Sequence, residues 1–242
     1  MKLTFSGPGV PALMRSGYYW GVLALAQAVI IVPRAYTVDN HKLLLLYWTI
    51  ALGVTTRAPS ALQFNARWLI GLCFAFAFLW KVGRGEYYDG SFLHYSMATD
   101  SRFDFFSHWL CGAPLHAAWT NQAQVSEVLW GASSELTLLD GPRSSAVATI
   151  LSWWTLLLEG FIATAFLIPS RTRFSRFRNV LLLIFVLSTY AIAPVIGFAW
   201  LLLLMGFAQA LPNEAFSKTS YLVVLVVTQI FLIPWGQLLT TT

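Results

Sequence analysis

The chain has 242 residues, of which 57% are hydrophobic and 10% are charged, against roughly 25% charged residues in an average soluble domain. So few charges exclude a soluble globule, and we predict a single transmembrane helical domain over residues 1–242. The excess of 15 Lys and Arg over 10 Asp and Glu gives a net charge of +5, which we attribute to membrane topology, so no nucleic acid is expected as a partner.

Seven apolar stretches predict an all-α fold, a polytopic transmembrane helical bundle of six or seven spans. A helix needs about 20 apolar residues to cross about 30 Å of hydrocarbon. The second stretch has a short apolar centre, Leu43–Val54, so we expect it to be tilted, short or partly buried in protein. The predicted spans are Ser16–Val32, Lys42–Thr55, Ala66–Val82, Ser145–Ile168, Asn179–Ala193, Pro194–Ala210 and Thr219–Leu239.

The fifth and sixth stretches form one apolar run that is too long for a single crossing. Pro194 and Gly197 interrupt it, and a proline removes one helix hydrogen bond and clashes with the preceding turn. A helical hairpin or a broken helix follows, and we expect the hairpin.

Charge placement predicts the orientation of the bundle. The loop Pro169–Arg178 carries four arginines and no acid, whereas residues 83–142 carry seven acids and two arginines. Positive loops stay in the cytoplasm. We therefore expect a bacterial inner or plasma membrane protein with a cytoplasmic N terminus, an uncleaved first span and residues 83–142 on the periplasmic or outside face.

Residues 83–142 are predicted to form an extramembrane or interfacial insertion with helices of its own. Ser91–Ala98 and Asp104–Leu110 are aromatic and amphipathic, and Ala113–Leu139 has helical spacing of its apolar residues. We expect these helices to lie at the interface.

Lys81 and Glu159 are the candidate catalytic residues, because ionisable groups in or beside hydrocarbon are costly. Lys81 ends the third span, where its ammonium can either reach the interface on its long stem or act as a base. Glu159 lies within an apolar span and must face the bundle interior, be protonated or pair with Lys81, Tyr190 or a backbone group. A structural tie between helices and a role in proton handling are both open for Glu159.

The four histidines argue against an intramembrane tetrapyrrole. All of them fall in predicted loops or interfacial segments (His41, His94, His108 and His116), whereas a haem in a bundle needs an axial ligand there. Asp104 and His108 could share a helix face near His116 or Asp100, but a metal needs three or four converging ligands. No metal site and no bound cofactor are therefore expected, with quinone or lipid left open as ligands.

Several short motifs resemble one known family. The first three are Phe78-Leu-Trp-Lys81, Gly85-Glu-Tyr-Tyr-Asp-Gly-Ser-Phe92 and Asp100-Ser-Arg-Phe103, and the others are Glu159, the arginine-rich loop Pro169–Arg178 and Ile196-Gly-Phe198. In this order, over about residues 15 to 210, they resemble the HTTM family. That family is the membrane domain related to vitamin K-dependent γ-carboxylase and is distantly similar to DoxX-like proteins.

The resemblance implies a role for Lys81, since a lysine in the first motif is the candidate base for the vitamin hydroquinone in the carboxylase. Two differences weaken a transfer of that activity. The family often has a histidine before Ile-Gly-Phe, where this chain has Ser188-Thr189-Tyr190, and the chain ends soon after the bundle. Carboxylation of protein glutamate is therefore not expected.

Three functions follow, in order of preference. The first is a non-catalytic accessory or structural subunit of a larger respiratory or photosynthetic electron-transfer complex, with other integral membrane subunits and membrane lipids as partners. The second is an HTTM- or DoxX-like membrane enzyme or redox partner acting on a quinone-like substrate. The third is a small transporter, which the break at Pro194 alone suggests.

Overall fold

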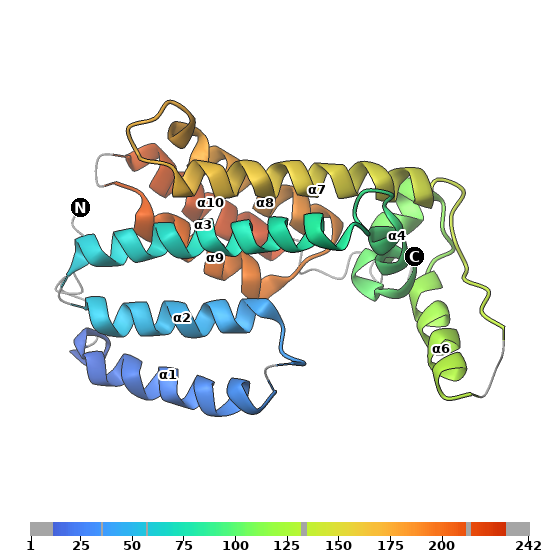
Figure 1. Ribbon diagram of the computed structural model, residues 1–242, viewed down its shortest axis with the longest axis horizontal. Coiled ribbons are helices and arrows are strands. Elements are labelled where there is room, and N and C mark those ends of the chain that lie inside the picture. The colour runs from blue at the N-terminus through green and yellow to red at the C-terminus, as the bar shows by residue number, and fades with distance from the viewer. Residues whose placement is uncertain (1–11, 35, 57, 132–134, 212–213, 231–242) are drawn as a thin grey trace. The chain divides into compact units, whose positions relative to one another are not determined.

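The computed structural model describes residues 12–34, 36–56, 58–131, 135–211 and 214–230, among which helices are joined by turns and irregular segments and no β-strand occurs. Five short helical turns accompany the longer helices: η1 (Ala12–Arg15), η2 (Val32–Arg34), η3 (Ser101–Phe103), η4 (Ser107–Cys111) and η5 (Phe174–Phe177). The helices, labelled in Figure 1, are α1 (Gly17–Ile31), α2 (Asn40–Thr55), α3 (Pro59–Arg84), α4 (Ser91–Thr99), α5 (Asp104–Phe106), α6 (Ala117–Leu129), α7 (Ser144–Leu167), α8 (Arg178–Ile192), α9 (Ile196–Gln209) and α10 (Ala215–Ile230).

Among the described residues, three helices are long and apolar enough to cross a membrane: Pro59–Arg84, Ser144–Leu167 and Phe174–Ile192. The chain is thus an all-helical membrane protein. A helix also occupies each of the other predicted ranges, but these helices are shorter. The count of six or seven crossings therefore stays a prediction.

The predicted boundaries differ from the structure mainly at the third and last spans. The helix α3 begins at Pro59 rather than Ala66, because a proline in the first turn lacks only an N–H that would be unpaired there. The helix α10 begins at Ala215 rather than Thr219, and the predicted end of that span lies outside the described residues.

The chain divides into two compact units, and the division falls within α3, α7, α8 and α10. The first unit contains residues 1–75, 162–186 and 196–228, and the second contains residues 76–161, 187–195 and 229–242. Each unit is described separately below.

In the first unit, α1 and α2 lie side by side as a hairpin (Figure 1). A Cβ atom added to Gly17 would stand 3.0 Å from the carbonyl oxygen of Gly53, so glycine permits the close approach of the two backbones. The amide Nε2 of Gln27 donates to the hydroxyl of Thr49 at 3.2 Å, which adds a polar tie between the apolar helices.

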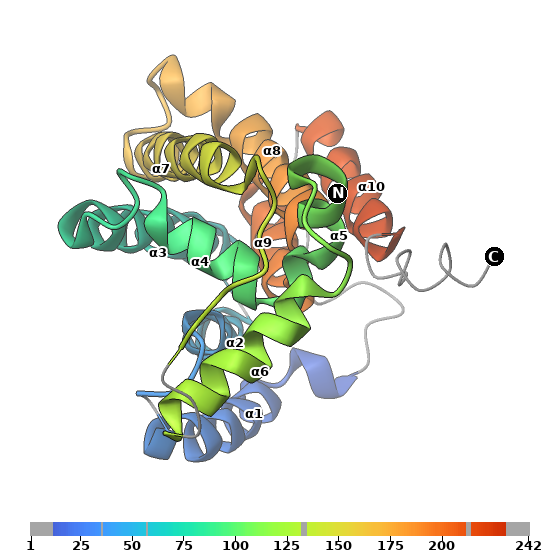
Figure 2. The ribbon, with the colours of Figure 1, turned by 90° about the vertical axis from the view of Figure 1, so that its right-hand side faces the viewer.

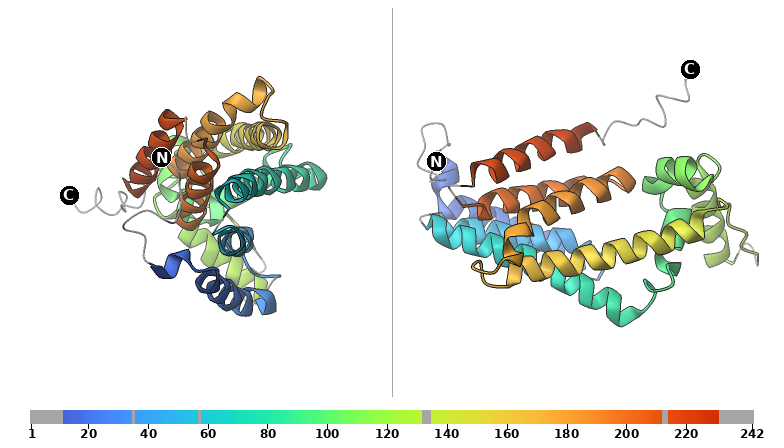
Figure 3. Two further views of the ribbon diagram at one scale, coloured as in Figure 1. Left: turned by 90° about the vertical axis from the view of Figure 1, so that its left-hand side faces the viewer. Right: turned by 90° about the horizontal axis from the view of Figure 1, so that it is seen from above.

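A buried polar network joins α8, α9 and α10 in the same unit. Figure 3 shows α9 and α10 at the orange-to-red end of the colour scale. Arg178 Nε donates to Gln209 Oε1 at 2.9 Å, and Gln209 Nε2 donates to Asn179 Oδ1 at 2.6 Å. The start of α8 therefore lies beside the end of α9, which is the hairpin arrangement rather than a broken helix. The hydroxyl of Tyr221 in α10 donates to the same Asn179 oxygen at 3.0 Å.

The second unit contains the insertion predicted at residues 83–142, whose helices Figure 2 shows beside the chain segment that leads into α7. The range Ala113–Leu139 is not helical throughout, because α6 ends at Leu129 and residues 135–141 have no regular secondary structure. Hydrogen bonds with Asn121 hold the chain around Leu139 out of a helix. The Asn121 amide donates to the carbonyls of Ala98 and Leu139, and its Oδ1 accepts from Leu139 N–H. Side-chain bonds thus replace the helical ones in that stretch.

Candidate functional site

The two candidate catalytic residues, Lys81 of α3 and Glu159 of α7, come together in the second unit. The close packing of these helices depends on Gly160, because a Cβ atom there would stand 3.2 Å from Phe78 Cε2. A glycine beside Glu159 therefore lets α3 approach α7 at the level of the two charged side chains.

Lys81 Nζ donates a hydrogen bond to Glu159 Oε1 and forms an ion pair with it. The side chains are 15% and 6% exposed, so both charges are largely removed from solvent. Removing two charges from water costs several kcal/mol each, and their attraction offsets this only when the remaining polar atoms are also satisfied. The second oxygen, Glu159 Oε2, is buried and has no hydrogen-bond partner among the described residues.

Tyr87 completes the cluster. Lys81 Nζ lies 5.0 Å from the centroid of the Tyr87 ring, within the range of a cation–π contact. Burial raises the pKa of Tyr87, and the negative charges of Glu159 and Glu86 raise it further. Its phenol therefore stays protonated at neutral pH. The ring also stacks on Phe92 at 4.9 Å between centroids.

This arrangement can accept a proton and hold an anion. The open lone pairs of Glu159 Oε2 can accept a proton from a hydroxyl group. The ammonium of Lys81 has three N–H donors, of which Glu159 takes one and the Tyr87 ring face attracts the charge, so it can also stabilise an oxyanion. The preceding residues of α3, Leu79 and Trp80, are strongly exposed, and the cluster therefore borders an exposed apolar surface.

The other sequence candidates are placed separately from this cluster. Glu159 pairs with Lys81 and not with Tyr190, the alternative partner considered above. Ser188, the first residue of the stretch Ser188-Thr189-Tyr190 compared above with the HTTM family, accepts from Trp154 Nε1 at 3.4 Å. The Lys81–Glu159 ion pair is thus formed without Ser188 or Tyr190 as a partner.

Asp104 and His108, the residues of the insertion considered as metal ligands, are engaged in local bonds. His108 Nδ1 pairs with the carbonyl of Ala113 at 2.9 Å, and Asp104 Oδ1 accepts from Ala118 N–H at 3.1 Å. No group of three His, Cys, Asp or Glu within the described ranges could hold a metal ion. His94 instead pairs with Asp140 at 2.6 Å.

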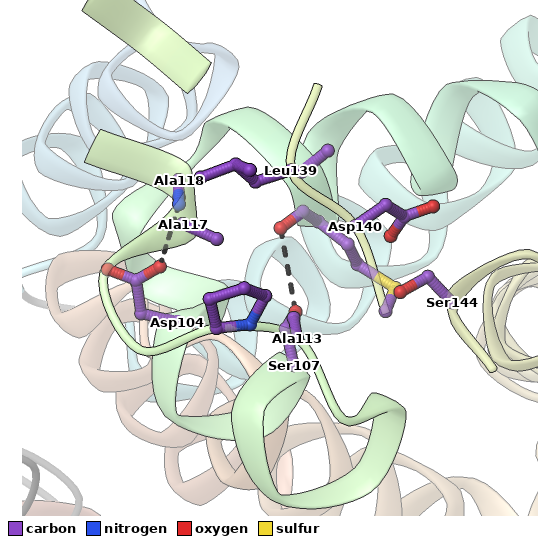
Figure 4. A pocket seen from close by; sticks show the side chains of 11 residues that line it. Asp104, Ser107, Ala113, Ala117, Ala118, Leu139, Asp140 and Ser144 are labelled. Carbon is purple, nitrogen blue, oxygen red and sulfur yellow. Dashed lines mark hydrogen bonds between the residues drawn. The ribbon is translucent and has the colours of Figure 1, made fainter. Parts of the chain in front are cut away.

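Figure 4 shows a small cavity in the insertion, with the Asp104–Ala118 bond on one side and Asp140 on the other. Ser107 and Ser144 add two hydroxyls to its wall. Burial raises the pKa of Asp104, although the bond from Ala118 opposes the change. The space is on the scale of a single water molecule, so the cavity fits a structural water and not a substrate.

Sequence reasoning missed Tyr87 and Asn121. Tyr87 follows the end of a span among other aromatic residues, and its closeness to Lys81 depends on the turn after α3. Asn121 is fully buried, and its only signal in the sequence is an amide among the apolar positions of an amphipathic helix.

Comparison with protein-family models, curated proteins and solved structures finds no match for this chain. The resemblance to the HTTM family therefore stays a prediction based on the short motifs.

Proposed function

We propose that this membrane protein handles protons of an amphipathic, quinone-like molecule at the Lys81–Glu159–Tyr87 cluster. The observation that carries the proposal is the buried Glu159 carboxylate, which uses one oxygen for Lys81 and leaves the other without a partner. A purely structural tie would leave that acceptor unsatisfied at a cost of about 1–3 kcal/mol. The hydroxyl of a bound molecule would satisfy it.

The proposed step is a proton transfer without a change of oxidation state. A hydroquinone O–H bond breaks, its proton moves to Glu159 Oε2, and the electron pair stays on the hydroquinone oxygen. The ammonium of Lys81 then stabilises the oxyanion, and the ring of Tyr87, with its phenol in the neutral form, lies beside the ammonium. The strongly exposed Leu79 and Trp80 on α3 let an apolar molecule arrive from the lipid.

The test uses the purified full chain in lipid nanodiscs with decyl-ubiquinol as the probe under anaerobic conditions. We expect saturable binding and an absorbance change of the quinolate anion in the wild type. Glu159→Gln keeps an acceptor and nearly the same shape but cannot accept the proton, so the probe should bind without the quinolate signal. A quinolate signal of equal size in Glu159→Gln, or no saturable binding to the wild type, would contradict the proposal.

An accessory subunit of a larger respiratory or photosynthetic complex is the second candidate, and the exposure of α1 favours it. Four apolar residues at helical spacing on one face of α1, Tyr18, Val22, Leu25 and Val29, are exposed, while α2 is the helix beside it. Such a surface suits contact with another membrane subunit or with lipid.

Purification from native membranes without cross-linking separates the two candidates. A stable assembly with other subunits, lost after Val22→Asn and Leu25→Asn in α1, would favour the accessory role. A monodisperse chain that carries quinone would favour the first proposal. The cytoplasmic N terminus and the bacterial inner membrane belong to both proposals and rest on the asymmetry of the arginines.

A further inference from the structure

Loop 168–177, between α7 and α8, is held at its first end by Arg67 of α3. The Nε atom of Arg67 donates to the carbonyl of Phe166 at 2.7 Å, and its other nitrogens donate to the carbonyl of Ile168 and the hydroxyl of Ser170. The last carbonyls of a helix have no partner within the helix. Arg67 thus satisfies the end of α7 and fixes the direction in which the loop leaves it.

Arg178 holds the other end of the loop. Its Nη1 donates to the hydroxyl of Ser175 at 3.3 Å, and its Nη2 bonds to Glu214 at the same distance. Between the two ends, Thr172 N–H donates to the carbonyl of Pro169, and Thr172 Oγ1 accepts from Ser175 N–H. The loop is therefore an ordered turn, and the N–H donors of both anchoring arginines bond to acceptors within the protein.

Three further arginines, Arg171, Arg173 and Arg176, project from this turn. All three are exposed, and none makes a side-chain hydrogen bond or ion pair with a residue that the structure describes. The loop contains no Asp or Glu. Phe177 beside them is 56% exposed, although it is apolar. The turn thus presents three uncompensated guanidinium groups together with an aromatic ring.

The position of the loop favours lipid as the partner. It follows one helix that is long and apolar enough to cross a membrane, Ser144–Leu167, and its residues 174–177 form the first turn of the next, Phe174–Ile192. Its ten residues are too few to carry it far from the helix ends. Its arginines therefore lie at the level of the headgroups, where guanidinium groups can bind phosphate through paired N–H donors. An aromatic side chain at that level is stabilised at the boundary of headgroups and acyl chains.

We propose that loop 168–177 binds anionic phospholipid, with Arg171, Arg173 and Arg176 on the headgroup phosphates and Phe177 at the acyl boundary. The proposal does not depend on the Lys81–Glu159 cluster. Each exposed arginine near an anionic membrane surface strengthens binding about fivefold. Removing all three should therefore weaken binding by about a hundredfold.

The test measures binding of short-chain phosphatidylglycerol to the detergent-solubilised full chain by native mass spectrometry. The test variant is Arg171→Gln/Arg173→Gln/Arg176→Gln. The control variant, Arg34→Gln/Arg84→Gln/Arg143→Gln, has the same net charge and also changes exposed arginines. We expect the test variant to lose affinity by about a hundredfold and the control to stay within about twofold, with weaker binding of phosphatidylcholine throughout.

Two further arms keep the result interpretable. Inorganic phosphate should compete poorly, since it lacks the acyl chains that we propose Phe177 contacts. Phe177→Ser should weaken the binding of phosphatidylglycerol and leave the binding of inorganic phosphate unchanged. Should the triple variant misfold, wild-type affinity must still fall when salt rises, because exposed charges are screened. Equal losses in test and control variants, equal binding of phosphatidylcholine, salt-independent affinity or full competition by inorganic phosphate would each overturn the proposal.

Discussion

Lys81 and Glu159 are separated by 78 positions in the sequence and form a largely buried ion pair between α3 and α7. Each charge offsets the cost of burying the other, so the two residues should be energetically coupled. This coupling can be measured apart from any activity.

The first prediction is a double-mutant cycle on that pair. Lys81→Met should destabilise the protein by about 3–5 kcal/mol, because it leaves a buried carboxylate without its counter-charge. Adding Glu159→Leu to Lys81→Met should restore much of that loss. Denaturant unfolding in detergent, followed by tryptophan fluorescence, gives the free energies. Strictly additive losses would show that the residues do not interact.

The second prediction concerns the buried network around Arg178. Arg178→Met should destabilise the protein more than Glu214→Gln, because Arg178 is almost fully buried and bonds three partners whereas the Glu214 side chain is 29% exposed. The expected losses are about 3 kcal/mol and about 1 kcal/mol. Thermal unfolding in detergent measures both, and a larger loss for Glu214→Gln would contradict this assignment.

The sequence was sufficient to predict helices whose apolar runs are long, and α7 begins and ends within one residue of its predicted bounds. It was also sufficient to single out Lys81 and Glu159, because charges within apolar runs are conspicuous. It was not sufficient to choose between Lys81 and Tyr190 as the partner of Glu159. That choice depends on the rotation of α3 and α7 about their axes, which the packing of Phe78 against Gly160 fixes.

The insertion shows where periodicity fails. Helical spacing continues beyond Leu129, but the bonds with Asn121 hold Leu139 in a segment that is not helical. A tertiary contact thus overrides a local preference, as is common in short amphipathic segments. The arginines of loop 168–177 look equivalent to Arg178 in the sequence, and only the fold separates the anchoring residue from the exposed ones.

The third prediction tests the orientation inferred from the arginines. Single cysteines at Ser126 in α6 and Arg173 in loop 168–177, in a chain with Cys73 and Cys111 changed to Ser, should react from opposite sides of sealed vesicles. Both positions are exposed. A membrane-impermeant maleimide added outside measures the accessible fraction, and detergent gives the total. Reaction of both positions from one side would contradict the orientation.

The last prediction concerns Asp140, whose carboxylate pairs with His94 at 2.6 Å and accepts from Gly141 N–H at 2.8 Å. Burial works to raise the pKa of Asp140, but the bonds from Ser144, His94 and Gly141 outweigh it, and the pKa lies below its usual value. A carboxyl group with a lowered folded-state pKa stabilises the fold above its unfolded pKa of about 3.9. That contribution is lost as the pH falls through the folded-state value.

Asp140→Asn should therefore cost about 1 kcal/mol at pH 7, a modest value because the side chain is 35% exposed and water screens the pair. The difference from wild type should shrink below pH of about 4 and vanish at still lower pH. Thermal unfolding in detergent between about pH 3 and pH 7 measures it. His94→Gln, which retains an N–H donor toward Asp140, is the matched control and should lose less than Asp140→Asn. A difference that is still undiminished at pH of about 3 would contradict the lowered pKa of Asp140.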